Sequence, residues 1–212
     1  MVINWYGEGC FKISEGPLTL MVDPYESSTG LTPPRFKSDI VIKTLLPAIT
    51  EEAQKPISYT DGETNIISGP GEFEIKNVVI RGWPLHADSS ESELKSIFRV
   101  QLGELTLGLL GHLGKFADSE LFEELGDIDI LIIPGGNSPF LSQSEAAKVI
   151  RQIEPRLVIP SFFAVKGLKR KASDVGDFLK ELGHSGEKAQ EKLTIKKKDL
   201  DPEKMQVAVL TI

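Results

Sequence analysis

Cysteine, histidine and long apolar runs are scarce in this chain of 212 residues. The single cysteine, Cys10, excludes an internal disulfide, and the first residues lack a basic stretch followed by an apolar run. Both observations predict a cytoplasmic protein. No segment approaches the roughly 20 apolar residues of a membrane helix. The net charge of −7 disfavours a nucleic-acid backbone, whose binding needs a basic face. We expect neither membrane nor nucleic-acid partners.

The residues that are present suit an ordinary globular fold. A hydrophobic content of 40% over this length predicts one domain, residues 1–212, with a sizeable core. No low-complexity linker divides the chain. The first half is rich in short apolar or alternating runs, which predict strands at 2–6, 10–13, 18–22, 39–44, 65–68, 72–75, 77–82, 97–102 and 105–110.

The second half alternates helix and strand signals. Helices are predicted at 118–125, after the capping box Ser142-Gln-Ser-Glu145, and at 173–182, with a further short helix starting at Thr50. Apolar runs predict strands at 128–134, 157–160, 193–195 and 206–212. Lys196–Lys198 is interpreted as a solvated strand end or turn. Periodicity alone therefore indicates an α/β or α+β protein with many strands.

Several segments, in their order and spacing, resemble the metallo-β-lactamase superfamily, near its lactonase-like branch of predicted metal-dependent hydrolases. The segments are NWYGEGCFKI, LTLMVDP, SGPGEFEI, GLLGHLGKF, ILIIPGG and EAAKVIRQIEPRLVIP. The resemblance covers nearly the whole chain. It implies an α+β fold, specifically a four-layer αββα sandwich.

The same resemblance implies a metal centre, yet its first ligand cluster is missing. The superfamily carries His-x-His-x-Asp-His after the strand that matches DIVIKTLLPAIT. The corresponding positions hold Leu45, Pro47, Ile49 and Thr50. None of these side chains offers the usual metal-ligating atoms.

The later ligand positions are only partly kept. His86 falls where the resemblance implies a later histidine, and His112 falls where it implies the bridging aspartate. Lys115 and Phe162 fall where it implies two further histidines. A catalytic zinc site needs about three protein ligands and an open position for water. We therefore expect no cofactor. Zinc or manganese would be expected if His86 and His112 converge with Asp88 or Glu8 in a residual site.

Other candidate groups carry weaker signals. Cys10 is interpreted as a small buried hydrophobe. The loop PGGNSPF before Ser142 could hold an anion, but a chain reversal is favoured. Glu72 and Glu74 share one side of a strand, where a solvated face is the simpler interpretation. His184 follows a helix end and receives no catalytic role.

These observations lead to two functional hypotheses, with the catalytic residues left unassigned. The first is a metallo-β-lactamase-fold protein that is catalytically degenerate and acts as a binding or assembly module. The alternative is a metal-dependent hydrolase of phosphoesters, lactones or amides with a reduced site around His86 and His112. A homo-oligomer, or a complex with an intact paralogue, is compatible with both.

Overall fold

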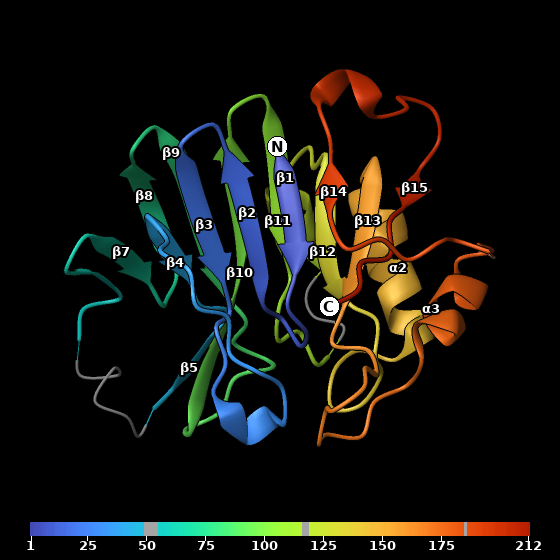
Figure 1. Ribbon diagram of the computed structural model, residues 1–212, viewed down its shortest axis with the longest axis horizontal. Helices are drawn as coiled ribbons and strands as arrows, with labels where there is room; N and C mark the ends of the chain where they lie inside the picture. Colours follow the sequence, from blue (N-terminus) through green and yellow to red (C-terminus); the bar gives the residue numbers. More distant parts are fainter. Residues whose placement is uncertain (49–54, 116–118, 185) are drawn as a thin grey trace.

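Two β-sheets lie face to face in the structure (Figure 1). The structure is a computed structural model that describes residues 1–48, 55–115, 119–184 and 186–212. The short helix predicted at Thr50 and the position of Ile49 lie outside the described residues. The predicted α+β sandwich is confirmed. The prediction that residues 1–212 form one domain stays a prediction.

The first sheet begins with an antiparallel meander. β1, β2 and β3 pair in sequence, with Val2 opposite Ser14 and Phe11 opposite Val22. β4 then pairs in parallel with β3, and β7 pairs in parallel with β4. The strands, in spatial order, are β14 (Leu193–Thr194), β1 (Val2–Trp5), β2 (Phe11–Glu15), β3 (Leu18–Val22), β4 (Ile40–Ile42), β7 (Thr64–Ile67) and β6 (Ser58–Asp61).

The second sheet is antiparallel on one side and parallel on the other. β8, β9, β10 and β11 pair antiparallel, whereas β11, β12, β13 and β15 pair in parallel. β5 pairs with the start of β10. The strands are β5 (Leu45–Pro47), β8 (Gly71–Ile75), β9 (Val78–Pro84), β10 (Glu93–Leu102), β11 (Leu105–Leu109), β12 (Ile130–Pro134), β13 (Leu157–Ser161) and β15 (Gln206–Val207).

The helices are α1 (Ser119–Glu124), α2 (Gln143–Ile153) and α3 (Val175–Glu181), with 3-10 turns η1 (Ser27–Thr29) and η3 (Lys197–Asp199). Figure 1 shows α2 behind β13, away from the first sheet. The predicted capping box is confirmed, because Ser142 accepts from the Glu145 N–H and the Glu145 carboxylate accepts from the Ser142 N–H. No helix in the described part of the chain is long and apolar enough to cross a membrane.

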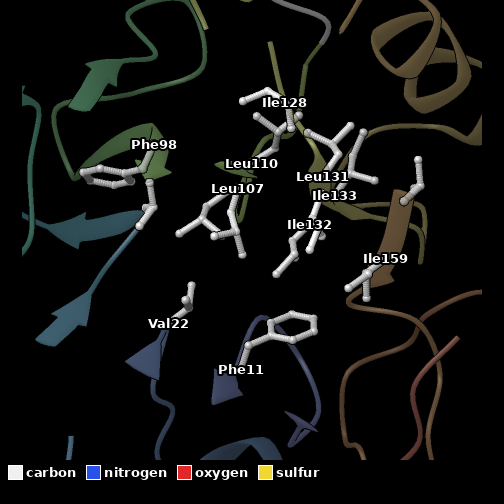
Figure 2. Close-up of a cluster of buried hydrophobic side chains, with 14 of the residues drawn as sticks. Phe11, Val22, Phe98, Leu107, Leu110, Ile128, Leu131, Ile132, Ile133 and Ile159 are labelled. Carbon is white, nitrogen blue, oxygen red and sulfur yellow. The ribbon is translucent and has the colours of Figure 1, made fainter. Parts of the chain in front are cut away.

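The core lies between the two sheets and beneath the helices. Figure 2 shows Phe11 and Val22 of the first sheet pointing toward Leu107 and Ile132 of the second. These side chains belong to one contiguous buried cluster. Burial of a large apolar side chain contributes about 1.5–3 kcal/mol. Packing between the sheets therefore fixes the loops at the strand ends, where the polar residues gather.

Candidate functional site

A pocket of about 570 Å³ lies where several strands end. Segments following β1, β3, β4, β11, β12 and β13 all contribute to it, so it sits at the carboxyl ends of these strands. Ligands of sheets with parallel strands bind at such ends, because the loops there vary without disturbing the core. The lining residues are Glu8, Gly9, Asp23, Pro24, Tyr25, Glu26, Thr29, Lys43, Leu45, Pro47, His112, Phe140, Phe162 and Arg170.

A buried hydrogen-bonded chain connects Asp23 and His112, which line this pocket, through the buried side chain of Thr44. The Thr44 N–H donates to Asp23 Oδ1 at 2.7 Å, and Thr44 Oγ1 lies 2.7 Å from Asp23 Oδ2. The same Oγ1 lies 2.7 Å from His112 Nδ1 and accepts the His112 backbone N–H at 3.2 Å. Burial raises the pKa of Asp23, while the nearby His112 and the bonds from Thr44 act in the opposite direction.

A partly buried ion pair forms a second polar feature. Arg170 donates from Nε and Nη2 to the two carboxylate oxygens of Glu8, at 3.2 and 2.8 Å. Arg170 Nη2 also donates to the Phe162 carbonyl at 2.7 Å, and the Phe162 N–H donates to the Glu8 carbonyl at 3.0 Å. This bidentate pair ties the β1–β2 turn to the segment after β13.

Aromatic rings form one wall of the pocket. The Phe140 and Phe162 ring centroids are 4.1 Å apart, and the His112 ring packs edge-on against Phe162 at 5.0 Å. The Arg170 guanidinium lies 5.1 Å from the Phe140 ring centroid. The Phe162 contact restrains the His112 ring, and the guanidinium contact with Phe140 adds to the stability of this aromatic wall.

The backbone at the pocket is unusually constrained. Glu8, Asp23 and Phe162 all adopt positive φ, at 49°, 41° and 58°. Such conformations cost of order 1–3 kcal/mol for residues with a Cβ and cluster at functional sites. A Cβ at Gly111 would overlap Thr44 Oγ1, and a Cβ at Gly9 would lie 2.5 Å from the Phe162 ring. The surrounding chain is therefore fitted closely to these side chains.

The donor set does not fit a catalytic metal ion. Among the described residues, no group of three or more His, Cys, Asp or Glu side chains is placed to hold one. Leu45, Pro47 and Phe162 line the pocket with apolar atoms. Glu8 is engaged by Arg170, and Asp23 by Thr44. We therefore derive no catalytic step through a metal.

A family model described as the β-lactamase superfamily domain matches residues 2–161. The chain belongs to the metallo-β-lactamase superfamily. A UPF0173 protein of Pyrococcus abyssi is 27% identical over 187 residues, covering 79% of this chain and 85% of the relative. A UPF0173 metal-dependent hydrolase of Pyrobaculum arsenaticum is 26% identical over 207 residues, covering 84% and 90%.

Two solved structures share the fold, and the first is described as a member of the metallo-β-lactamase superfamily. A proposed zinc-dependent hydrolase of Thermotoga maritima aligns over 99% of this chain and 97% of its own, with a TM-score of 0.78 and 23% identity. A metallo hydrolase of Ignicoccus hospitalis aligns over 92% and 99%, with a TM-score of 0.65 and 14% identity. The names of these relatives favour the hydrolase alternative and give no support to a catalytically degenerate protein.

The two histidines predicted to form a residual metal site of the superfamily lie in different surroundings. His112 lines the pocket, whereas His86 is exposed in the turn after β9 and does not line it. Asp88 is buried, but it pairs with Lys95 Nζ at 3.3 Å and accepts the Gly114 N–H at 2.6 Å. Glu8 does line the pocket. The metal-binding role of His86 and His112 stays a prediction.

The weaker candidates have structural explanations. Cys10 is fully buried, and burial with the nearby Asp23 raises the pKa of its thiol. Glu72 and Glu74 are exposed on β8, as their solvated-face interpretation predicts. At the start of α2, the Glu145 carboxylate occupies the place where an anion could bind. His184 Nδ1 lies 3.1 Å from Glu187.

Sequence reasoning missed Thr44, Arg170 and the role of Asp23. Thr44 was assigned only to a strand, and Arg170 lies in a polar loop without a recognisable motif. Asp23 follows a predicted strand and precedes Pro24, which is the one local signal that could have drawn attention to it. The contacts of Thr44 and Arg170 span 68 and 162 residues of sequence, beyond the reach of spacing rules.

Proposed function

We propose that this chain is a hydrolase of small carboxylic or phosphoric esters, lactones or amides, with His112 as its acid–base group. The observation that carries the proposal is the position of His112 in the pocket at the strand ends, with Nδ1 engaged by Thr44. The names of the relatives support the reaction class. The hydrogen-bonded chain of Asp23, Thr44 and His112 and the concentration of positive φ values support this location.

The chemistry follows from the ring of His112. A base at Nε2 takes a proton from water while the water oxygen bonds to the substrate carbonyl or phosphoryl centre. The protonated ring then returns the proton to the leaving group as its bond to that centre breaks. General acid–base catalysis of this kind contributes about 10²–10⁴-fold in rate. The apolar wall of Phe140, Phe162 and Leu45 suits substrates with an apolar substituent.

The test is turnover of 4-nitrophenyl esters, lactones, an anilide and bis(4-nitrophenyl) phosphate, measured in EDTA and again with zinc or manganese. We expect turnover in EDTA that falls about 10²-fold or more in His112→Ala. His86→Ala serves as the matched control, because His86 is exposed and outside the pocket. This control should retain the full rate.

Two outcomes would overturn the proposal. Turnover that requires added metal and disappears in His86→Ala would establish the reduced metal site instead. No turnover with any substrate, with or without metal, would remove the hydrolase assignment.

A binding or assembly module is the second candidate. It is favoured by the Glu8–Arg170 pair and the Phe140–Phe162 contact, which line the pocket with side chains already engaged with one another. We propose for this case a homo-oligomer or a complex with an intact paralogue, located in the cytoplasm. Size-exclusion chromatography with light scattering, alone and with a paralogue added, tests both assemblies. A protein that is monomeric alone and forms no complex with the paralogue would contradict this candidate.

A further inference from the structure

The three groups of the buried chain have fixed hydrogen-bonding capacities. Thr44 Oγ1 carries one hydrogen and lies 2.7 Å from both Asp23 Oδ2 and His112 Nδ1. An ionised carboxylate can only accept, so it takes the single hydroxyl hydrogen of Thr44. The Thr44 oxygen must then accept from His112, which requires a hydrogen on Nδ1. The other ring nitrogen, Nε2, is left with a free electron pair in a neutral ring.

The opposite arrangement has opposite consequences. A neutral Asp23 would donate to Thr44, the Thr44 hydroxyl would donate to Nδ1, and the hydrogen of His112 would sit on Nε2. Burial raises the pKa of Asp23 and so favours this arrangement. Against burial act the Thr44 N–H bond at 2.7 Å, the Thr44 hydroxyl and the nearby Lys43 and His112. The two arrangements are distinguishable because they place the proton on different ring nitrogens.

We propose that Asp23 and Thr44 are positioning residues that form a hydroxyl-bridged Asp–Thr–His relay, which holds His112 with its proton on Nδ1 and its free pair on Nε2. This inference rests on the proposed function only for its catalytic consequence. The tautomer itself is a property of the resting protein.

The surroundings of the relay restrict alternative geometries. Thr44 is 1% exposed and Asp23 is 7% exposed, so water does not compete for their hydrogen bonds. The space beside Thr44 Oγ1 exists only because residue 111 is glycine. The Phe140 and Phe162 rings pack edge-on with the imidazole ring, at centroid distances of 5.9 and 5.0 Å. His112 is held at its ring Nδ1 and at its backbone N–H by the same Thr44 oxygen, and its ring also makes two aromatic contacts, so it has little rotational freedom.

The decisive experiment is two-dimensional ¹H–¹⁵N NMR of the protein labelled with ¹⁵N-histidine, recorded at a pH where the ring is neutral. The chain has three histidines, so His112→Gln identifies the signals of His112 by their loss. We expect a protonated Nδ1 and an unprotonated Nε2. A protonated Nε2 in the neutral ring of the wild-type protein would by itself overturn the proposal.

Variants of Thr44 test the relay itself. Thr44→Val keeps the shape and removes the hydroxyl, whereas Thr44→Ser keeps the hydroxyl. Thr44→Val should shift His112 toward the Nε2–H tautomer and lower kcat about tenfold or more, with little change in KM. Thr44→Ser should keep the wild-type tautomer and the wild-type kcat. A Thr44→Val protein with the wild-type tautomer would contradict the relay. Asp23→Asn provides a second variant if Thr44→Val does not fold.

The two proposals can fail separately. An Nδ1–H tautomer in a protein without turnover upholds the relay and removes the hydrolase assignment. If turnover depends on His112 but the His112 tautomer is the same in Thr44→Val as in the wild type, the hydrolase assignment stands and the relay is contradicted.

Discussion

At the scale of single residues, the pocket is defined by side chains whose neighbours make room for them. The position of Thr44 requires a glycine at 111, because a Cβ there would overlap its side chain. The position of Phe162 likewise requires glycines at 9 and 136. These requirements are visible only in three dimensions. In the sequence, the same glycines are indistinguishable from turn glycines such as Gly62, which has open space around it.

Gly111→Ala tests this close fit. The new methyl group would overlap the Thr44 hydroxyl, and the backbone would have to keep a φ of 22°. We expect a loss of about 2–4 kcal/mol in the free energy of unfolding, measured by urea denaturation, and a changed His112 tautomer. Gly62→Ala is the matched control, because its φ is 60° but no atom lies within 4 Å. Equal losses in both variants would show that backbone strain alone accounts for the effect.

The sequence predicted part of the site at this scale. The absence of metal ligands at Leu45, Pro47 and Phe162 follows from residue types at positions given by the resemblance, and the structure shows these side chains lining the pocket. Thr44 and Arg170 could not be predicted. Their roles depend on partners distant in the chain, and neither residue type carries a chemical signature alone.

At the scale of elements, local signals were the most reliable. The capping box at Ser142 and the buried run of β12 were correctly predicted, because their stabilising interactions lie within a few residues. β5 and β6 were not predicted. β5 consists of only three residues that pair with β10, some 50 residues further along the chain, so its identity as a strand depends on tertiary contact.

Lys197 is a second case: the cluster is largely exposed, as predicted, but the tertiary contact of Lys197 has no local signal in the sequence. Its Nζ lies 2.5 and 2.6 Å from the two carboxylate oxygens of Asp129, which is 4% exposed. This contact ties η3 to the start of β12. Lys197→Met should lower the free energy of unfolding by about 1–3 kcal/mol in a thermal or urea titration, because a buried carboxylate loses its main partner.

Lys198→Met is the control for this prediction, since the Lys198 side chain is exposed. It should change stability by less than about 0.5 kcal/mol. A similar effect of both substitutions would mean that the net charge of the cluster, rather than the Asp129 contact, stabilises the C-terminal segment.

At the scale of the whole molecule, the two sheets are joined by more than their shared core. At the end of the sandwich away from the pocket, Lys76 of the β8–β9 turn donates to Asp39 at 2.6 Å, just before β4. The hydrogen bond from Lys76, followed by that from the Thr19 N–H, lowers the pKa of Asp39. A polar contact thus links the second sheet to the first.

The pKa of Asp39 gives this link a defined pH dependence. The folded pKa is below the unfolded value of about 3.9, so the stabilisation is present above about pH 4 and is lost as the pH falls through the folded pKa. Lys76→Met should lower the free energy of unfolding by at most about 0.5 kcal/mol at pH 7, and the difference should shrink toward pH 3. Urea titrations at several pH values measure it.

Lys37→Met is the reference variant for this experiment. Lys37 and Glu63 are 4.0 Å apart and almost fully exposed, so their contact contributes little. The free energy of unfolding of Lys37→Met should equal that of the wild type at every pH. A Lys76→Met deficit that persists unchanged at pH 3 would contradict the ionic origin of the link.

Phe162 contacts several neighbours at once, so the effect of replacing it depends on the residues around it. Its ring fits against Gly9, its carbonyl against Gly136, and the same carbonyl binds Arg170. A histidine placed at 162 alone would forfeit the ring contact with Phe140 and would still face the Glu8–Arg170 pair. Sequence drift at 9, 136, 162 and 170 should therefore be correlated among orthologues, with few viable single-step intermediates between this pocket and a metal-binding one.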